Sequence, residues 1–146
     1  METLYDRDFY EWTQKNAQLL REGRLSEIDI DNLAEELETM GRSEKRAFVN
    51  HLALLIAHLL KWECQPVFRS KIWKYTIREQ RAQVTDILDD NPSFKHSLDE
   101  MFLKAYGKAI VRVVKETGLD EDMLPATCPY QLEDILDTTF LPGGNA

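Results

Sequence analysis

LALLIAHLL, at residues 52–60, is the most apolar stretch of the sequence, because eight of its nine residues are apolar and only His58 is polar. Apolar side chains continue on both sides of it at helical spacing: Phe48, Leu52, Leu55, Leu59 and Trp62. A helix that is apolar nearly all round is surrounded by other helices. The pattern therefore predicts a central helix near residues 43–64, enclosed by the rest of the fold.

Apolar residues recur at helical spacing in several other segments as well. We expect helices at residues 5–22, from Asp29 or Asp31 to Met40, at 70–89, from Asn91-Pro92 to Thr117, and a short one at 130–136, with ends or interruptions at Gly23, Gly41, Pro66 and Gly118. No segment shows the alternation of a half-buried strand. The sequence predicts an all-α fold, a compact bundle of about five helices with a short C-terminal helix.

Length and composition indicate one globular domain. The chain has 146 residues, of which 43% are hydrophobic and 30% charged, so we expect a single helical domain over residues 1–146, ordered over about 5–140 and frayed over 141–146. The longest apolar run falls short of the roughly 20 residues that cross a bilayer, and the N-terminus METLYDRDFYEW does not resemble a signal peptide. We therefore expect a cytoplasmic protein without membrane association.

Charge is distributed unevenly along the chain. Residues 1–40 hold 4 basic and 11 acidic residues, residues 41–81 hold 9 and 3, and residues 82–146 hold 5 and 12, which gives the net charge of −8. A basic middle between acidic flanks indicates either an anion-binding surface or neutralisation between neighbouring helices. Both interpretations remain open at the level of the sequence.

The basic middle reaches its highest density of cations and aromatics in residues 61–81, KWECQPVFRSKIWKYTIREQR. Cations beside aromatic rings suit phosphate contacts and base stacking, although the same residue types also serve ordinary core packing. The acidic total charge opposes nucleic acid at long range, so nucleic-acid binding is kept as an alternative. The candidate anion-binding residues are Arg69, Lys71, Lys74, Arg78 and Arg81.

His51 and His58 lie seven residues apart on the predicted central helix, and facing helices could add Glu35 or Glu36 to form a site between helices. Two helical turns separate the two rings by about 10 Å, too far for both to ligate one ion readily. With Trp62, these four residues are our candidate functional cluster. We predict no metal and no cofactor, and keep a metal-binding or hydrolytic protein using them as an alternative.

Several blocks of the sequence resemble a known family. These are YDRDFYEWTQKNAQLLREGR, DNLAEELETMGRSEKRA, HLLKWECQP, RSKIWKYTI, NPS, KETGL and CPY, in this order. The chain is similar to the family catalogued as domain of unknown function 29, small bacterial and largely cyanobacterial helical proteins. The resemblance implies a compact helical protein and no established activity. It suggests these positions for probing: Trp12, Asn32, Glu35, Glu36, Gly41, His58, Trp62, Trp73 and Arg81.

No nucleophile elbow, phosphate-cradling glycine loop or paired CxxC motif is present in the sequence. An acidic helical chain with charge blocks and many aromatic residues is typical of a binding protein. The function is therefore unknown from the sequence, and our first hypothesis is a non-enzymatic protein-interaction module, with another protein or a second copy of the chain as its partner.

Overall fold

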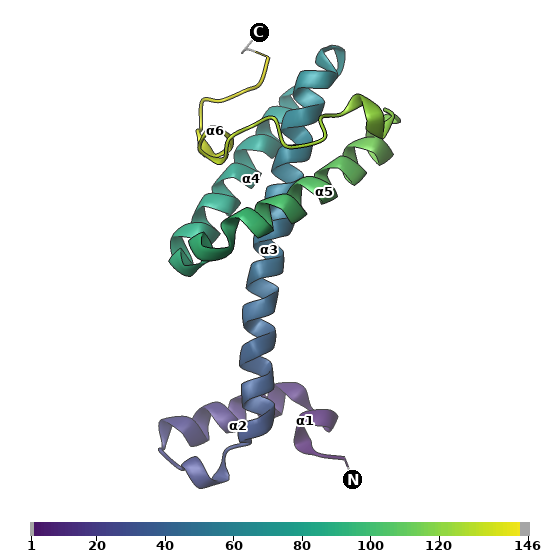
Figure 1. Cartoon of the computed structure of the whole chain (residues 1–146). Coiled ribbons are helices and arrows are strands. Elements are labelled where there is room, and N and C mark those ends of the chain that lie inside the picture. The colour runs from purple at the N-terminus through teal and green to yellow at the C-terminus, as the bar shows by residue number, and fades with distance from the viewer. Residues whose placement is uncertain (1, 144–146) are drawn as a thin grey trace. The chain divides into compact units, whose positions relative to one another are not determined.

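The computed structural model describes residues 2–143 (Figure 1). Within these residues the secondary structure consists of helices, and there is no strand. The α-helices are α1 (Leu4–Arg7), α2 (Phe9–Arg21), α3 (Ile30–Cys64), α4 (Lys71–Asp90), α5 (Leu98–Thr117) and α6 (Leu132–Leu136). Short 3-10 turns lie at Leu25–Glu27, Pro66–Phe68, Pro92–Ser97 and Glu121–Met123. The all-α prediction is confirmed.

The chain divides into two compact units, Met1–Ser43 (unit 1) and Glu44–Ala146 (unit 2). Helix α3 contributes its first part to unit 1 and the remainder to unit 2. A single domain over residues 1–146 stays a prediction. No helix within residues 2–143 is long and apolar enough to cross a membrane.

The prediction that Gly41 separates two helices is wrong, because α3 continues through it. Gly41 has a negative φ, unlike Gly23 and Gly118, which have φ of 71° and 75° and follow the ends of α2 and α5. A glycine inside a helix costs only about 1 kcal/mol relative to alanine, so good helix formers on both sides maintain the helix. The central helix therefore begins at Ile30 instead of near residue 43.

The single helix expected at residues 5–22 is divided at Asp8 into α1 and α2. The Asp8 side chain accepts a hydrogen bond from the Glu11 backbone N–H at 3.0 Å and so caps α2. An aspartate that binds a nearby backbone amide in this way favours a helix start over a helix interior. Asn91-Pro92 likewise begins a 3-10 turn, and α5 starts only at Leu98.

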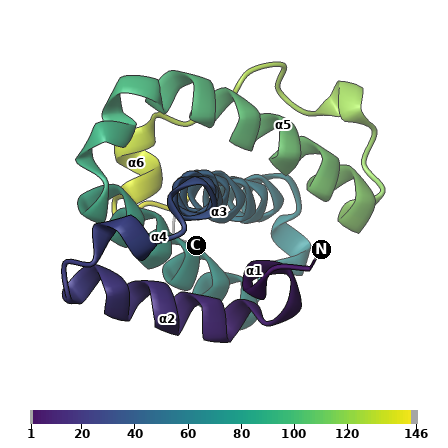
Figure 2. The same cartoon turned by 90° about the horizontal axis from the view of Figure 1, so that it is seen from below.

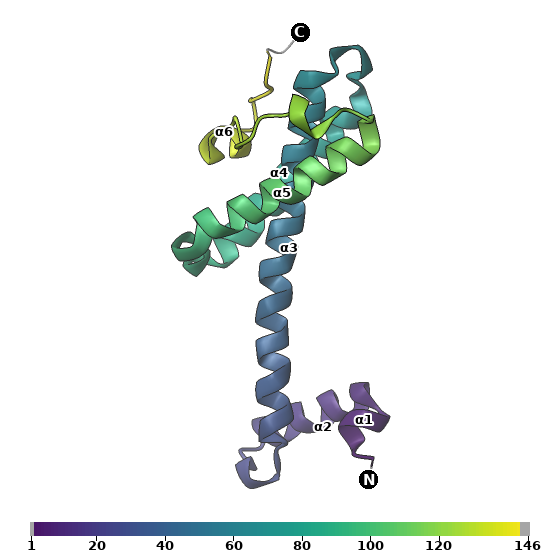
Figure 3. The same ribbon diagram turned by 45° about the vertical axis from the view of Figure 1, so that its right-hand side comes forward.

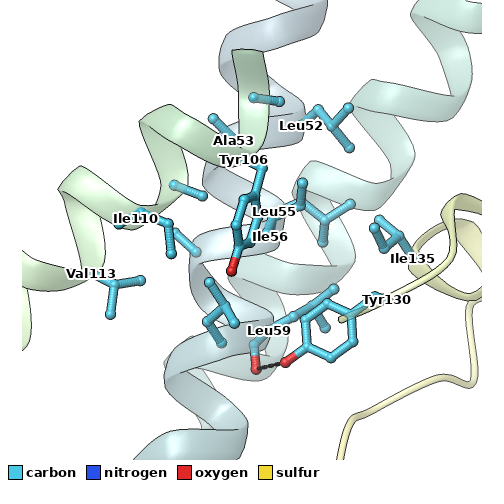
Figure 4. Packing of buried hydrophobic residues seen from close by; sticks show 14 of the residues in the cluster. Leu52, Ala53, Leu55, Ile56, Leu59, Tyr106, Ile110, Val113, Tyr130 and Ile135 are labelled. Atoms are coloured by element: carbon cyan, nitrogen blue, oxygen red, sulfur yellow. Dashed lines mark hydrogen bonds between the residues drawn. The ribbon is translucent and has the colours of Figure 1, made fainter. Parts of the chain in front are cut away.

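Unit 2 is built around residues 48–62 of α3. Viewed along α3, helices α4, α5 and α6 lie on different sides of this segment (Figure 2). Ten of its side chains are fully or almost fully buried apolar groups: Phe48, Val49, Leu52, Ala53, Leu55, Ile56, Ala57, Leu59, Leu60 and Trp62. Helix α4 supplies Ile77 to the same apolar cluster. Helices α5 and α6 supply Tyr106 and Ile135, among others (Figure 4). The predicted enclosure of LALLIAHLL is confirmed for this segment.

The chain after α5 returns across unit 2 and is tied to its helices (Figure 3). The Tyr130 hydroxyl donates to Glu63 Oε1 at 2.6 Å. It also lies 3.3 Å from the Leu59 carbonyl (Figure 4). The Tyr106 hydroxyl donates to the Pro125 carbonyl at 2.5 Å. Pro142 is buried, whereas residues 144–146 of the tail expected to fray lie outside the described part of the chain.

Candidate functional site

A cationic pocket of about 520 Å³ lies in unit 2 between α4 and the C-terminal segment. Four of its lining residues are cations on α4, at spacings of 3, 4 and 3 residues, which place them on one helix face. Apolar and hydroxyl groups complete the wall. The lining residues are Lys71, Lys74, Tyr75, Ile77, Arg78, Arg81, Thr138, Thr139 and Leu141.

Two backbone carbonyls hold the guanidinium of Arg81 in place at the wall of this pocket. Arg81 is only 5% exposed, its Nε donates to the Ile135 carbonyl at 2.6 Å, and its Nη2 donates to the Phe140 carbonyl at 3.0 Å. Desolvation lowers the pKa of Arg81, although the Asp137 carboxylate partly opposes this effect. The guanidinium therefore attaches the C-terminal segment to α4 and keeps its charge at the pocket wall.

Four of the five candidate anion-binding residues line this pocket, and Arg69 does not. Arg69 Nε instead donates to the Trp62 carbonyl at 2.7 Å, and its guanidinium lies 5.0 Å from the Trp62 ring centroid. Lys74 Nζ lies 5.8 Å from the same centroid. Trp62 itself is buried, and its indole N–H has no hydrogen-bond partner among residues 2–143. Its role in a functional cluster stays a prediction.

The two histidines of the candidate cluster make separate local contacts. His58 is buried, and its Nδ1–H donates to the Leu54 carbonyl at 3.0 Å. Desolvation lowers the pKa of His58, so the neutral ring is favoured. His51 is half-buried, with its Nδ1 2.6 Å from Oε1 of the buried Gln80. Both rings therefore have structural partners in unit 2.

Glu35 and Glu36 belong to unit 1, whereas His51 and His58 belong to unit 2. The Tyr5 hydroxyl donates a hydrogen bond to Glu36. This bond, together with desolvation and the neighbouring carboxylates, raises the pKa of Tyr5 to about 12. Residues 2–143 contain no group of three His, Cys, Asp or Glu side chains that could hold a metal ion. A metal-binding or hydrolytic site at Glu35, Glu36, His51 and His58 stays a prediction.

Polar contacts hold α2 to the beginning of α3 in unit 1. Asp29 Oδ2 accepts from Trp12 Nε1 and from Asn32 Nδ2, each at 2.9 Å, while the Asp29 backbone N–H donates to Asn16 Oδ1 at 2.8 Å. The side-chain hydrogen bonds from Asn32 and Trp12 lower the pKa of Asp29. The Asp29 carbonyl also accepts from the Leu33 N–H and so begins α3.

Among residues 2–43 of unit 1, only two large apolar side chains are buried, Trp12 and Leu19. The exposed large apolar residues of unit 1 are Phe9, Tyr10, Leu20, Leu25, Ile30, Leu37 and Met40. Three of these lie on α3 within about 80° of one another, because residues seven and ten positions apart fall on the same side of a helix. We name Ile30, Leu37 and Met40, each more than 60% exposed, the apolar stripe.

Reasoning from the sequence found the cations of the pocket but missed its opposite wall. Thr138, Thr139 and Leu141 carry no motif, and they meet α4 only because the C-terminal segment folds back onto it. Asp29 was expected only as one of two possible helix starts, and its bonds to Trp12 and Asn32 were not predicted. The one available signal for the cationic face was the regular spacing of basic residues in α4.

The described residues define an all-α protein with a cationic pocket in one unit and an exposed apolar stripe in the other. The sequence pattern of the family described as domain of unknown function DUF29 matches residues 4–141, and the chain belongs to this family. No curated protein and no solved structure matches the chain.

Proposed function

We propose that this protein is a non-enzymatic interaction module that binds another protein through the apolar stripe of unit 1. The observation that carries this proposal is the imbalance within residues 2–43, where seven large apolar side chains are exposed, four are partly buried and only two are buried. Contiguous exposed apolar surface commonly marks a binding site for another protein. A cytoplasmic location, predicted from the sequence, is part of the proposal.

The charge of unit 1 specifies the chemistry of the partner. Eleven acidic and five basic residues give Met1–Ser43 a net charge of −6. A partner surface with apolar residues flanked by Lys and Arg complements both features, since complementary charge accelerates association and selects among partners. A second copy of unit 1 would carry the same negative charge and be repelled. The proposed occupant is therefore an amphipathic helix with basic flanks.

The experiment compares two double variants of the full chain. Leu37→Gln/Met40→Gln makes the stripe polar, and Leu103→Gln/Val111→Gln makes the same kind of change at exposed sites on α5. The probe is a synthetic amphipathic helix with leucine on one face and lysine on the other, followed by fluorescence anisotropy. We expect binding to the natural chain and to the α5 variant, and loss of binding in the stripe variant.

Two further measurements distinguish the occupants. The same peptide with glutamate in place of lysine should not bind, because unit 1 would repel it. Light scattering should show a monomer at the concentrations used for binding. Equal binding of the lysine peptide to both double variants, or a dimer that only the stripe variant abolishes, would contradict the proposal, the latter in favour of a second copy.

A further inference from the structure

We propose that the cationic pocket of unit 2 binds a small organic phosphate of about nucleotide size. The site is separate from the apolar stripe, since all its lining residues belong to Glu44–Ala146. It therefore adds a ligand to a protein whose proposed partner binds elsewhere.

The charges that line the pocket define the sign of the ligand. Its wall contains two lysines and two arginines and no carboxylate, in a protein whose net charge is −8. Four positive charges match the three to four negative charges that a nucleoside di- or triphosphate carries, at roughly one to two charges per phosphate. Arginine forks and lysine ammonium groups are the side chains most used for phosphate recognition.

Neutralisation between neighbouring helices does not account for these cations. None of Lys71, Lys74, Arg78 and Arg81 forms an ion pair within 4.0 Å with a carboxylate of residues 2–143. The carboxylate whose charge acts on Arg81 is Asp137, and its Oδ1 accepts hydrogen bonds from the Thr139 N–H at 2.9 Å and from the Thr139 hydroxyl at 2.8 Å. These hydrogen bonds lower the pKa of Asp137 and keep it ionised, but it supplies one negative charge against four cations, so the pocket keeps a net positive charge.

The remaining wall indicates that the ligand has an organic portion. Tyr75 and Leu141 add aromatic and aliphatic surface beside the cations, and Tyr75 is 55% exposed, so part of its surface remains free for a planar group. Pockets of about 300–1,000 Å³ accommodate small organic ligands, and a volume of about 520 Å³ exceeds what a single phosphate ion fills. A phosphate joined to a base or another ring uses both parts of the wall.

Arg81 gives the pocket a preorganised element. Two backbone carbonyls hold its guanidinium in place before any ligand arrives, so its ordering adds little to the cost of binding. Lys71 and Arg78 are exposed and free to close on the phosphates. Variants of these two residues should therefore reduce binding without disturbing the contacts that attach the C-terminal segment.

Calorimetric titration of the full chain with ATP, inorganic pyrophosphate, citrate and adenosine tests the proposal. We expect ATP to bind most tightly, pyrophosphate more weakly, and citrate and adenosine least. Lys71→Gln/Arg78→Gln should weaken ATP binding by about tenfold or more, because two charge-assisted contacts are lost. The matched control is Lys104→Gln/Lys115→Gln, which removes the same charge from exposed sites on α5 and should leave affinity within about twofold.

Thermal unfolding of both double variants shows whether the fold is retained, and the stability of ATP-saturated chain should rise by mass action only where the pocket is intact. A single-stranded oligonucleotide of about twelve nucleotides tests the polymer against the small ligand. Tighter binding of the oligonucleotide than of ATP, equal loss of ATP affinity in both double variants, or citrate binding as well as ATP would overturn the proposal.

Discussion

Two parts of the same helix differ sharply in what covers them. In α3, the segment 48–62 lies among α4, α5 and α6 and buries most of its side chains, whereas Ile30, Leu37 and Met40 in unit 1 are largely exposed. Unit 2 is stabilised by apolar packing. The described part of unit 1 is held by hydrogen bonds centred on Asp29 and by ring contacts among Tyr5, Phe9 and Trp12, with only two large apolar side chains buried. Helix formation in α3 therefore does not require that its apolar side chains be covered, and the exposed ones are those to which we assign the proposed partner.

Substitution of one leucine by alanine in each part gives the largest expected effect. Leu55 is fully buried, so Leu55→Ala should lower the free energy of unfolding by about 2–5 kcal/mol through lost transfer energy and a cavity. Leu37 is 63% exposed, and Leu37→Ala should change the free energy of unfolding by no more than about 0.5 kcal/mol. Urea unfolding followed by circular dichroism measures both.

The pair provides its own control, because both residues belong to α3 and the same side-chain atoms are removed. Equal losses of stability would mean that unit 1 is packed as firmly as unit 2, and the comparison would fail. If Leu55→Ala left the free energy of unfolding unchanged, Leu55 would lie outside the core.

A smaller loss of stability is expected from substitution of Asp29, which accepts hydrogen bonds from two side chains of unit 1. Asp29→Ala removes the acceptor of the Trp12 and Asn32 bonds at the start of α3, and loss of such a helix-start residue costs about 1 kcal/mol. Amide hydrogen exchange should become faster in residues 9–40, with little change in residues 48–62. Uniform acceleration through both units would show that the two parts unfold together.

The smallest expected effect is the loss of stability at acidic pH that results from protonation of His58. Because desolvation holds the pKa of His58 below its usual 6.5, the unfolded chain binds a proton more readily than the folded chain, and stability is lost as the pH falls below 6.5. Charge from Lys61 and Arg112 also lowers this pKa, while the Leu54 hydrogen bond and Glu116 oppose the shift. His58→Gln should flatten the fall in stability between neutral pH and pH 5, measured by urea unfolding at each pH.

Asp29 loses its contribution to stability at a lower pH than His58, so the two units should respond to acid in different pH ranges. The pKa of Asp29 is lowered from 3.8 by hydrogen bonds, so its contribution is present above that pH and is lost only as the pH falls through the folded-state value. Acid should therefore weaken unit 2 through His58 before it weakens unit 1 through Asp29. If exchange in unit 1 accelerates first, this order is wrong.

Much of the fold could be predicted from the sequence. Pro66 and Gly118 mark the ends of α3 and α5 as expected, and the enclosure of Leu55 follows from the apolar run around it. The division at Asp8 and the continuation through Gly41 were not predicted, because each depends on a balance of about 1 kcal/mol between local capping and helix propensity. For the sites, the basic residues of α4 were named from the sequence as anion-binding candidates, but their common helix face and their pairing with Thr138 and Leu141 were not predicted.

Local chemistry determined the helices of this protein, since each helical hydrogen bond joins residues four positions apart and each apolar face can be read from spacing. Tertiary structure alone decided which faces meet. Arg81 binds the carbonyls of Ile135 and Phe140, more than fifty positions away, and this contact creates the cationic pocket. Such contacts depend on where burial of Tyr130 and Ile135 places the returning chain, and no short-range pattern specifies that path.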